Sequence, residues 1–510
     1  MNLLAKLEKT KILWWIIILC TLFFFLRFPS IIEPYWYGDE GIYEVVGQSM
    51  DHGHLLYRDI WDNKPPLLYV VYALAGGDQP TVKIYSILAG ILSIIAFFIL
   101  SEKVLNKPRV SIIITVLYVL LLGTPLLESN IANAEDFILL PIILGGLLVY
   151  HLVNKHADDP KHLIKSSSKI ILFWTGILLG IAFLFKIVAI FDMATFVCFF
   201  ILINLPKKMS WTIVKNALIR EINVTNKKSW FRYFLLGFVA PFILTVIYFA
   251  ANHAFTIFFQ STFSGNVSYV GWQNGLLGIP QGLLFIKTVI LLAALYAIFM
   301  KRALFSKPAL FIILWLIFSV YNAYFSERPY THYVLVLLPS FCLFIGLLFT
   351  THTHQTRLRL FAILASVLLL LIYQFQFNFV KAYLYYPNAV RFLTNEESVQ
   401  TYQSFFDTNV PRDYAVATFI NKSIKPSDNI FIWGNNAQIY ALSHKLPPGK
   451  YTVAYHILQN NALVETQIAI DKSKPKYIIA LKEIQPLPFA LPLYIMRYDI
   501  PGAIIYERSF

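Results

Sequence analysis

The feature that most constrains this chain is a series of apolar runs, most of them long enough to cross a lipid bilayer. The runs lie at about residues 12–28, 82–100, 110–123, 137–153, 170–185, 187–205, 233–251, 281–300, 309–325, 333–350 and 360–378. A bilayer has no water to satisfy exposed backbone groups, so runs of this kind are typical of transmembrane helices. The composition agrees, because 57% of the residues are hydrophobic and only 14% are charged. The sequence therefore predicts a polytopic α-helical membrane protein with about 11 transmembrane helices.

Basic residues are distributed unevenly among the loops that join these runs. Alternate loops carry clusters of Lys and Arg, whereas the other loops are poor in bases and hold most of the carboxylates. By the positive-inside rule the basic loops and the N-terminus are cytoplasmic, and an odd number of spans places the C-terminus outside. The net charge of +14 comes from basic residues that are spread over many short loops and do not form one basic face. We therefore expect no nucleic acid partner. The first run is too long for a signal peptide and lacks a cleavage site, which predicts a retained helix.

The first outside loop, residues 29–81, contains two segments that we expect to be interfacial helices. Residues 41–54 place apolar side chains at helical spacing, as in an amphipathic helix that lies on the bilayer. Pro65 and Pro66 begin a second apolar segment, residues 67–74, with proline in its first turn.

After about residue 379 the spanning runs end and polar residues return. Residues 428–434 and 476–481 are typical of buried strands, and residues 414–423 and 436–442 of helices. Strands that alternate with helices predict a small α/β domain. We therefore expect a transmembrane domain at 1–378 and an extracytoplasmic α/β domain at 379–510.

Two groups of charged residues in the first outside loop are candidates for chemistry. Asp39 and Glu40 are adjacent carboxylates that point in different directions, so that one can bind a metal or substrate while the other acts as a base. Asp62 and Lys64 precede the two prolines, and a lysine fixed in this way is suited to hold a phosphate. The alternatives are solvated loop acids and a lysine that reaches to the lipid headgroups.

Later outside loops supply further candidates. Glu135 and Asp136 stand at the mouth of a span, where an ionisable group needs a partner, although acids also favour helix N-termini. Lys186 follows the fifth span and is a second candidate for a phosphate ligand. Residues 264–266 and 272–274 form polar stretches that could line a sugar or acceptor groove.

The fifth outside loop adds a basic and aromatic segment. Arg328 offers a fork for phosphate oxygens, and His332 and Tyr333 add hydrogen-bond donors at the same depth. The alternative is an interfacial anchor of Arg, Tyr and His.

Taken in order, these segments resemble the dolichyl-phosphate-mannose protein mannosyltransferase-like family, whose bacterial relatives include the lipid A aminoarabinose transferases. The segments are the acidic pair after the first span, Lys-Pro-Pro before the second, Asn-Ala-Glu-Asp at 133–136 and Arg-Pro-Tyr-Thr-His-Tyr at 328–333. The resemblance covers about residues 10–380. Residues 430–434, Ile-Phe-Ile-Trp-Gly, also resemble the periplasmic tail of bacterial members, which predicts a bacterial plasma membrane.

The resemblance implies the C-type glycosyltransferase (GT-C) fold, a polyprenyl-phosphate-linked sugar donor and inversion at the anomeric carbon, outside the cell. By motif, Asp39 corresponds to the proposed general base and Lys64 to the lysine that contacts the donor phosphate. Glu135 or Asp136 corresponds to the second acidic position. The segment with Arg328, His332 and Tyr333 matches the late basic-aromatic segment of the family.

One position departs from the aminoarabinose transferases, which carry Glu immediately before this lysine. This chain has Asn63 there, and Asp62 is the nearest acid that could take its place. The metal ligands of those relatives therefore cannot be assigned to this chain by position alone.

The chemistry requires a base for the acceptor hydroxyl and cations for the departing phosphate. A divalent ion held by Asp39, Glu40, Asp62 and Glu135 could supply the positive charge, or Lys64 and Arg328 could supply it without metal. The sequence leaves both arrangements open, and no organic cofactor is expected.

Three other functions compete with this one. A transporter or lipid flippase would place ionisable groups mid-span, often in inverted repeats, whereas the spans here are nearly free of charge. A ligase for lipid-linked glycans is the nearest enzymatic rival, and an inactive scaffold is the third. The sugar, and whether the acceptor is a lipid, a glycan or a protein, stay open.

Overall fold

The structure is a computed structural model that describes residues 3–155, 166–205, 229–266, 281–484 and 486–509, with isolated positions at 215, 219, 270, 275, 276, 278 and 279. The chain forms two compact units that interleave along the sequence. Unit 1 comprises Met1–Arg27, Ser86–Tyr248 and Val267–Phe379, and unit 2 comprises Phe28–Tyr85, Phe249–Asn266 and Val380–Phe510. The predicted division at residue 378 stays a prediction, since the first outside loop groups with the C-terminal residues.

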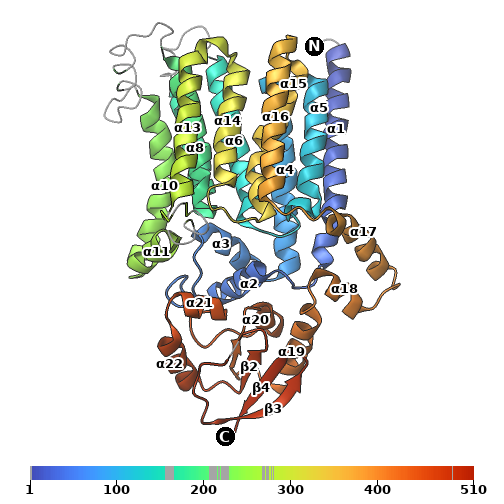
Figure 1. The fold of residues 1–510 in the computed structure, drawn as a ribbon, viewed down its shortest axis with the longest axis vertical. Coiled ribbons are helices and arrows are strands. Elements are labelled where there is room, and N and C mark those ends of the chain that lie inside the picture. Colours follow the sequence, from blue (N-terminus) through green and yellow to red (C-terminus); the bar gives the residue numbers. More distant parts are fainter. Residues whose placement is uncertain are drawn as a thin grey trace. The chain divides into compact units, whose positions relative to one another are not determined.

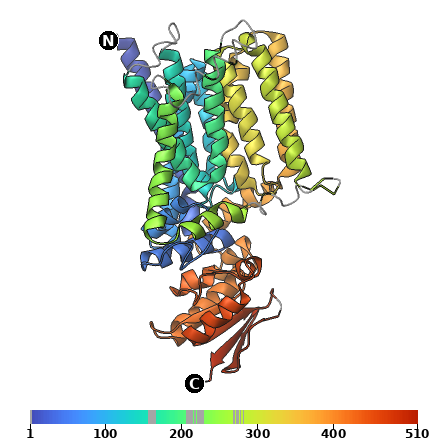
Figure 2. The same cartoon turned by 90° about the vertical axis from the view of Figure 1, so that its left-hand side faces the viewer.

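Unit 1 consists of long apolar helices whose axes run roughly parallel (Figures 1 and 2). The helices that lie wholly or mainly in this unit are α1 (Leu3–Arg27), α4 (Gln79–Leu105), α5 (Pro108–Gly123), α6 (Ala134–Lys155), α7 (Ser166–Phe185), α8 (Ile190–Asn204), α10 (Trp230–Ala251), α13 (Gly282–Lys301), α14 (Lys307–Ala323), α15 (Leu338–Thr350) and α16 (His354–Gln374). Short 3-10 helices are η2 (Pro125–Leu127), η4 (Ile187–Ala189), η6 (Arg302–Leu304) and η7 (Thr331–Leu337).

Among the described residues, 9 segments are long and apolar enough to cross a membrane, and α5 and α14 are two shorter apolar helices. Together they correspond one for one to the predicted runs, so the polytopic helical fold class is confirmed. The two short runs begin with a proline near the helix start, at Pro108 and Pro308, which fixes where the helices begin.

Helices α7 and α10 of unit 1 approach each other closely through glycines. A Cβ added to Gly176 would lie 2.1 Å from the carbonyl oxygen of Phe234, and one added to Gly237 would lie 2.0 Å from that of Phe173. Small residues at such positions let the backbones of membrane helices come together.

Unit 2 contains a mixed sheet of four strands with the order β1-β2-β4-β3. The strands are β1 (Ile430–Trp433), β2 (Tyr477–Leu481), β3 (Tyr494–Ile500) and β4 (Ala503–Arg508). Strands β1 and β2 are parallel, and β4 is antiparallel to both of its neighbours. The two predicted strands and the small α/β domain are confirmed. The β3–β4 hairpin was not predicted, because β3 is largely exposed and mixes charged with apolar residues.

The helices of unit 2 come from three parts of the chain. They are η1 (Phe28–Ile32), α2 (Gly38–Asp51), α3 (Pro66–Leu74), α11 (Phe255–Thr262), η5 (Ser264–Asn266), α17 (Phe379–Leu393), α18 (Val399–Phe406), α19 (Val410–Ser423), α20 (Gln438–Ser443), α21 (Ala454–Gln459) and α22 (Leu463–Ser473). The predicted helices of the first outside loop, α2 and α3, both form and pack side by side (Figure 1).

The first outside loop and the C-terminal residues share one core. Trp61 of the loop packs in a cluster with Phe431, Trp433 and Ile478 of the sheet. A Cβ added to Gly41 of α2 would lie 2.8 Å from the side chain of Gln438 in α20, so these helices are in direct contact. Helix α2 is consequently buried on nearly all sides within unit 2.

Candidate functional site

Asp39 and Lys64 form a partly exposed ion pair in unit 2. Asp39 lies in the first turn of α2, and Lys64 precedes the two prolines that begin α3. The Lys64 Nζ donates a hydrogen bond of 3.1 Å to Asp39 Oδ2. The two side chains keep 38% and 29% of their surface exposed. A carboxylate and an ammonium group are thus held together where a ligand can reach them.

Buried tyrosines fix both members of this pair. The Tyr43 hydroxyl donates to Asp39 Oδ2 at 3.0 Å, and the Lys64 ammonium lies 4.6 Å from the centre of the Tyr43 ring. Burial, followed by the Asp39 charge, raises the pKa of Tyr43 well above its usual value, so the hydroxyl keeps the proton that it donates. The Lys64 backbone donates to the Tyr69 hydroxyl at 3.2 Å and accepts from Tyr57 at 2.6 Å.

Glu40, the neighbour of Asp39, points into the interior of unit 2. Its carboxylate oxygens lie 2.6 Å and 2.9 Å from Nζ of Lys83, and both side chains are almost completely buried. Lys83 also lies 3.6 Å from Oε2 of Glu33. The Glu33 carboxylate accepts hydrogen bonds from Trp36 and Tyr385. Glu40 therefore takes part in a buried charge cluster and does not share the exposed position of Asp39.

Glu44 adds a third carboxyl group to this buried cluster. It is 0% exposed, and neither of its side-chain oxygens has a hydrogen-bond partner among the described residues. Burial, and then the charge of Glu40, raise the pKa of Glu44 well above its usual value. The neutral form of Glu44 is thus favoured by its surroundings, which limits the net negative charge of the cluster.

Asp62 faces a histidine of the C-terminal part of unit 2. Its Oδ1 lies 3.7 Å from Nε2 of His456, whose ring packs edge-on against Trp61 with centroids 4.8 Å apart. Burial lowers the pKa of His456 to about 4, although Asp62 acts in the opposite direction, so His456 is neutral near pH 7. Asp62 is 1% exposed. Asp62 is therefore buried beside His456, whereas Asp39 is partly exposed.

In unit 1, four of the predicted residues come together. Lys186 forms an ion pair with Glu135 at the start of α6, and its ammonium lies 4.3 Å from the centre of the Tyr333 ring. His332 packs against Tyr333 at a centroid distance of 4.6 Å, and its Nε2 lies 3.9 Å from Glu135 Oε1. Its Nδ1 lies 2.7 Å from Oε2 of Glu128. The result is a mixed cluster of acid, base and aromatic groups.

Asp136 lies on a different side of α6 from Glu135. Its Oδ2 accepts a hydrogen bond of 2.8 Å from Ser86 and lies 3.7 Å from the guanidinium of Arg27. All three side chains are buried. The sequence left the second acidic position open between these two residues, and the geometry joins Glu135, not Asp136, to Lys186 and His332.

The remaining predicted residues have separate surroundings. Arg328 is half-buried in the segment between α14 and η7. In unit 2, Asn266 donates from Nδ2 to the backbone oxygen of Asn63 at 2.7 Å, next to Lys64. The other polar stretch of that loop, residues 272–274, lies outside the described residues.

Sequence reasoning missed Lys83, Glu33 and His456. Lys83 carried a signal, because it lies inside an apolar run, where an ionisable residue needs a partner. Glu33 and His456 gain importance only through residues far along the chain, which no local pattern reveals.

The predicted metal ligands do not gather. Asp39, Glu40 and Asp62 face Lys64, Lys83 and His456 respectively, and Glu135 belongs to unit 1. Across the described parts of the chain, no group of three or more His, Cys, Asp and Glu side chains could hold a metal ion. The residues as they lie do not fit the predicted centre, so the divalent ion stays a prediction and no step below depends on it.

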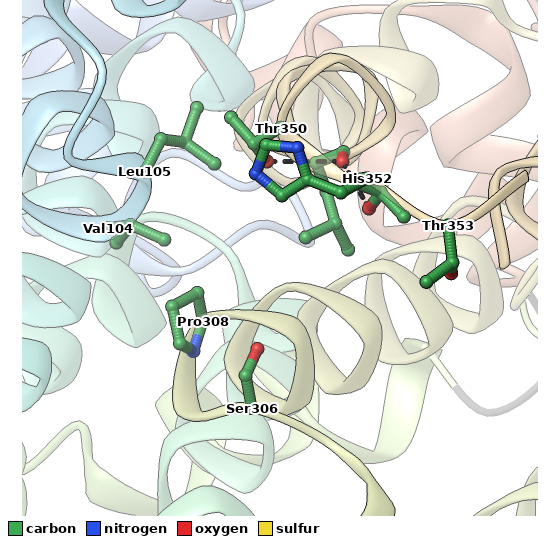
Figure 3. Close-up of a pocket in the computed structure, with 9 residues that line it drawn as sticks. Val104, Leu105, Ser306, Pro308, Thr350, His352 and Thr353 are labelled. Carbon is green, nitrogen blue, oxygen red and sulfur yellow. Dashed lines mark hydrogen bonds between the residues drawn. The ribbon is translucent and has the colours of Figure 1, made fainter.

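A cavity of about 340 Å³ in unit 1 lies apart from these clusters (Figure 3). It is formed at the end of α4 by Leu105, at the start of α14 by Ser306 and after α15 by His352. These helix ends are the ones that the charge distribution predicts to be cytoplasmic. Among the described residues, no Lys, Arg, Asp or Glu lines this cavity, and none of the predicted site residues does.

Comparison with known proteins identifies the fold. No family model matches the chain, and no curated protein matches its sequence. Among solved structures, ArnT from Cupriavidus metallidurans bound to undecaprenyl phosphate is similar, with a TM-score of 0.54 and 14% identity over 96% of this chain and 97% of that chain. The chain has the GT-C fold.

The apo state of the same ArnT gives a TM-score of 0.52 at 14% identity, with the same coverage of both chains. The archaeal oligosaccharyltransferase AglB from Archaeoglobus fulgidus, in complex with an inhibitory peptide and a dolichol-phosphate, gives 0.49 at 12% identity over 93% of this chain and 70% of that chain. The two ArnT structures confirm the GT-C fold that the short motifs predicted.

Proposed function

We propose that this protein is a glycosyltransferase that moves a sugar from a polyprenyl-phosphate-linked donor to an acceptor hydroxyl outside the cell. The observation that carries the proposal is the Asp39–Lys64 pair. A partly exposed carboxylate lies 3.1 Å from an ammonium group, in a chain with the GT-C fold. A lipid phosphate is a good leaving group, so the reaction requires a base and a cation, and this pair supplies one of each.

The residues act as follows in this proposal. Asp39 accepts the proton of the acceptor hydroxyl while the hydroxyl oxygen forms a bond to the anomeric carbon. The bond from that carbon to the phosphate oxygen breaks on the opposite side, which inverts the configuration. The electron pair leaves with the phosphate, and Lys64 stabilises the negative charge. Tyr43 orients Asp39 through its hydrogen bond.

The cluster in unit 1, taken by itself, is proposed to bind phosphate oxygens of a polyprenyl-phosphate lipid. Lys186 is held by Glu135 and Tyr333 and keeps 21% of its side chain exposed. Arg328, His332 and Tyr333 remain candidate phosphate donors from the same unit. A divalent ion would add positive charge at the phosphate, and EDTA treatment tests whether one is required.

The test uses the full-length protein in lipid nanodiscs with undecaprenyl-phosphate sugars labelled in the sugar, and with extracted cell-envelope material as acceptor. We expect the label to move to the acceptor with release of one undecaprenyl phosphate per sugar. The Asp39→Asn variant should lose this transfer. Asp59→Asn is a matched control, because Asp59 lies on the same loop and pairs with the exposed Arg58 at 2.8 Å.

Three outcomes would contradict the proposal. Asp39→Asn could transfer sugar at the wild-type rate, which would show that Asp39 is not the general base. Transfer of a preassembled lipid-linked oligosaccharide, but of no single sugar, would establish the ligase alternative. Movement of labelled lipid across a liposome bilayer without any transfer would establish the flippase.

A further inference from the structure

A cavity of about 310 Å³ lies within unit 2, beside the start of α2. Gly38, the residue before Asp39, forms part of its wall, together with residues of the C-terminal part of the unit. Its volume is at the lower end of the range of about 300–1,000 Å³ for small-molecule sites. The function proposed above assigns no ligand to it.

The walls combine one aromatic ring with many side-chain amides. Trp36 provides the ring, and the amides come from Asn409, Asn435, Asn436 and Gln438. Amide groups both donate and accept hydrogen bonds, which matches the hydroxyl groups of a sugar. An indole ring offers a flat apolar surface for the C–H groups of a sugar ring.

These groups are held in place before any ligand binds. The Trp36 Nε1 donates to Glu33 Oε2 at 3.0 Å, and its ring packs 5.7 Å from that of Phe406. The Asn436 Nδ2 donates to Asp413 Oδ2 at 2.7 Å, and Asp413 is itself paired with Arg412 at 2.7 Å. Fixed side chains reduce the entropy lost on binding.

Gln438 adds an observation that points to a ligand. It lines the cavity, is 1% exposed and lies against Gly41 of α2. Its Oε1 accepts no hydrogen bond from any residue that the structure describes. A buried amide oxygen without a partner is costly. Rotation of the Gln438 side-chain amide toward the cavity would let a ligand hydroxyl satisfy it.

The charges of the lining select among sugars. Asp407 and Glu483 line the cavity, and Glu483 forms an ion pair with Arg412. Among the described residues, no lysine, arginine or histidine lines it. The carboxylate of Asp407 therefore disfavours phosphates and uronic acids, whereas it tolerates neutral sugars and favours amino sugars.

We propose that this cavity is the acceptor subsite and that it binds a neutral or amino sugar. The assignment as acceptor rests on the proposed transferase function, since Gly38 places the cavity beside the residue that would act as base. The binding of a sugar does not depend on that function and can be measured without a donor.

The first experiment measures saturation-transfer NMR on the full-length protein in nanodiscs, with methyl α-mannoside, glucosamine and methyl glucuronide as probes. We expect transfer to the first two and none to the third. Asn435→Ala and Asp407→Lys change exposed wall residues and should weaken binding at least about tenfold, the effect of losing about 1.4 kcal/mol. Asp471→Lys is the matched control, an exposed acid of α22 outside the cavity.

The assignment as a sugar site is overturned if no probe binds, or if Asn435→Ala and Asp407→Lys bind as the wild type does. The assignment as acceptor is overturned if the same variants leave the acceptor KM of the transfer assay unchanged. If these variants transfer sugar with an unchanged acceptor KM, only the assignment of the cavity as acceptor subsite is refuted. Sugar binding without any transfer refutes the proposed transferase and, with it, the assignment as acceptor, and leaves only the sugar site.

Discussion

In each unit a pair of adjacent acids lies in the first turn of a helix, and in both pairs the two carboxylates have different surroundings. In unit 2, Asp39 is partly exposed beside Lys64, whereas Glu40 is buried against Lys83. In unit 1, Glu135 joins Lys186, whereas Asp136 joins Arg27 and Ser86. Successive residues of a helix point about 100° apart, so the two acids of each pair meet different partners. In unit 2 one acid stays partly exposed, whereas in unit 1 both are buried.

The two kinds of pair also differ in what their loss should cost. A partly exposed ion pair contributes about 0–1 kcal/mol to stability. Removing one partner of a buried pair costs about 3–5 kcal/mol, because it leaves an uncompensated charge in the interior. Substitutions should therefore separate activity from stability within each dipeptide.

The largest effect is expected for Asp39→Asn. Loss of a general base lowers rates by about 100- to 10,000-fold, whereas the midpoint of thermal unfolding should change little. Labelled sugar transfer and a thermal-shift assay measure the two quantities on one preparation. We expect Asp39 to be needed for activity and Glu40 for stability. This expectation is wrong if the Asp39→Asn variant unfolds at a clearly lower temperature while its folded fraction is fully active.

The next effect is expected for Lys83→Met, which removes the cation between Glu40 and Glu33. We expect a loss of about 3–5 kcal/mol in the free energy of unfolding, since two buried carboxylates lose their partner. Denaturant unfolding in detergent gives this value. Lys64→Met is the matched control, because it removes the cation of the partly exposed pair. An equal loss of unfolding free energy in both variants would contradict the expected difference between the buried and the partly exposed pair.

A smaller effect is expected for Asp136→Asn. The substitution weakens the contacts to Arg27 and Ser86, which should cost about 1–3 kcal/mol. Transfer activity per folded molecule should stay near the wild-type level, whereas Lys186→Met should raise the KM for the donor. A raised donor KM in Asp136→Asn would show that this acid contacts the donor after all.

The smallest effect concerns Glu44 and depends on pH. Its pKa is raised in the folded protein, so its neutral form gives full stability below the usual value of 4.5, and stability falls as pH rises through the folded pKa. Glu40, Lys83 and Asp78 are the charged groups that act on it. Glu44→Gln should match the wild type at pH 4.5 and unfold at a higher temperature at pH 8. The same difference at both pH values would argue against a neutral Glu44.

The sequence was sufficient to predict the membrane-spanning fold, whereas the roles of Asp39, Lys64 and Glu135 in a site stay predictions. The apolar runs follow from local composition, and β1 and β2 follow from short buried segments between turns. The partners of Glu40, Asp62 and Asp136 could not be predicted, because Lys83, His456 and Arg27 meet them only through packing over long sequence separations. The alternation of helices and strands after residue 379 likewise did not indicate that residues 28–85 join the C-terminal residues in one compact unit.

That interleaving has a consequence for how the protein is made. The backbone of Tyr35 donates to the hydroxyl of Tyr414 at 3.0 Å, across a separation of 379 residues. During synthesis the first outside loop leaves the ribosome early, but the groups that pack against α2 arrive only with the last quarter of the chain. Such distant contacts form late in folding. During most of its synthesis the chain therefore contains Asp39 without the α20 contact that completes the surroundings of α2. The acidic loop reaches its final structure only after the C-terminal residues have been synthesised.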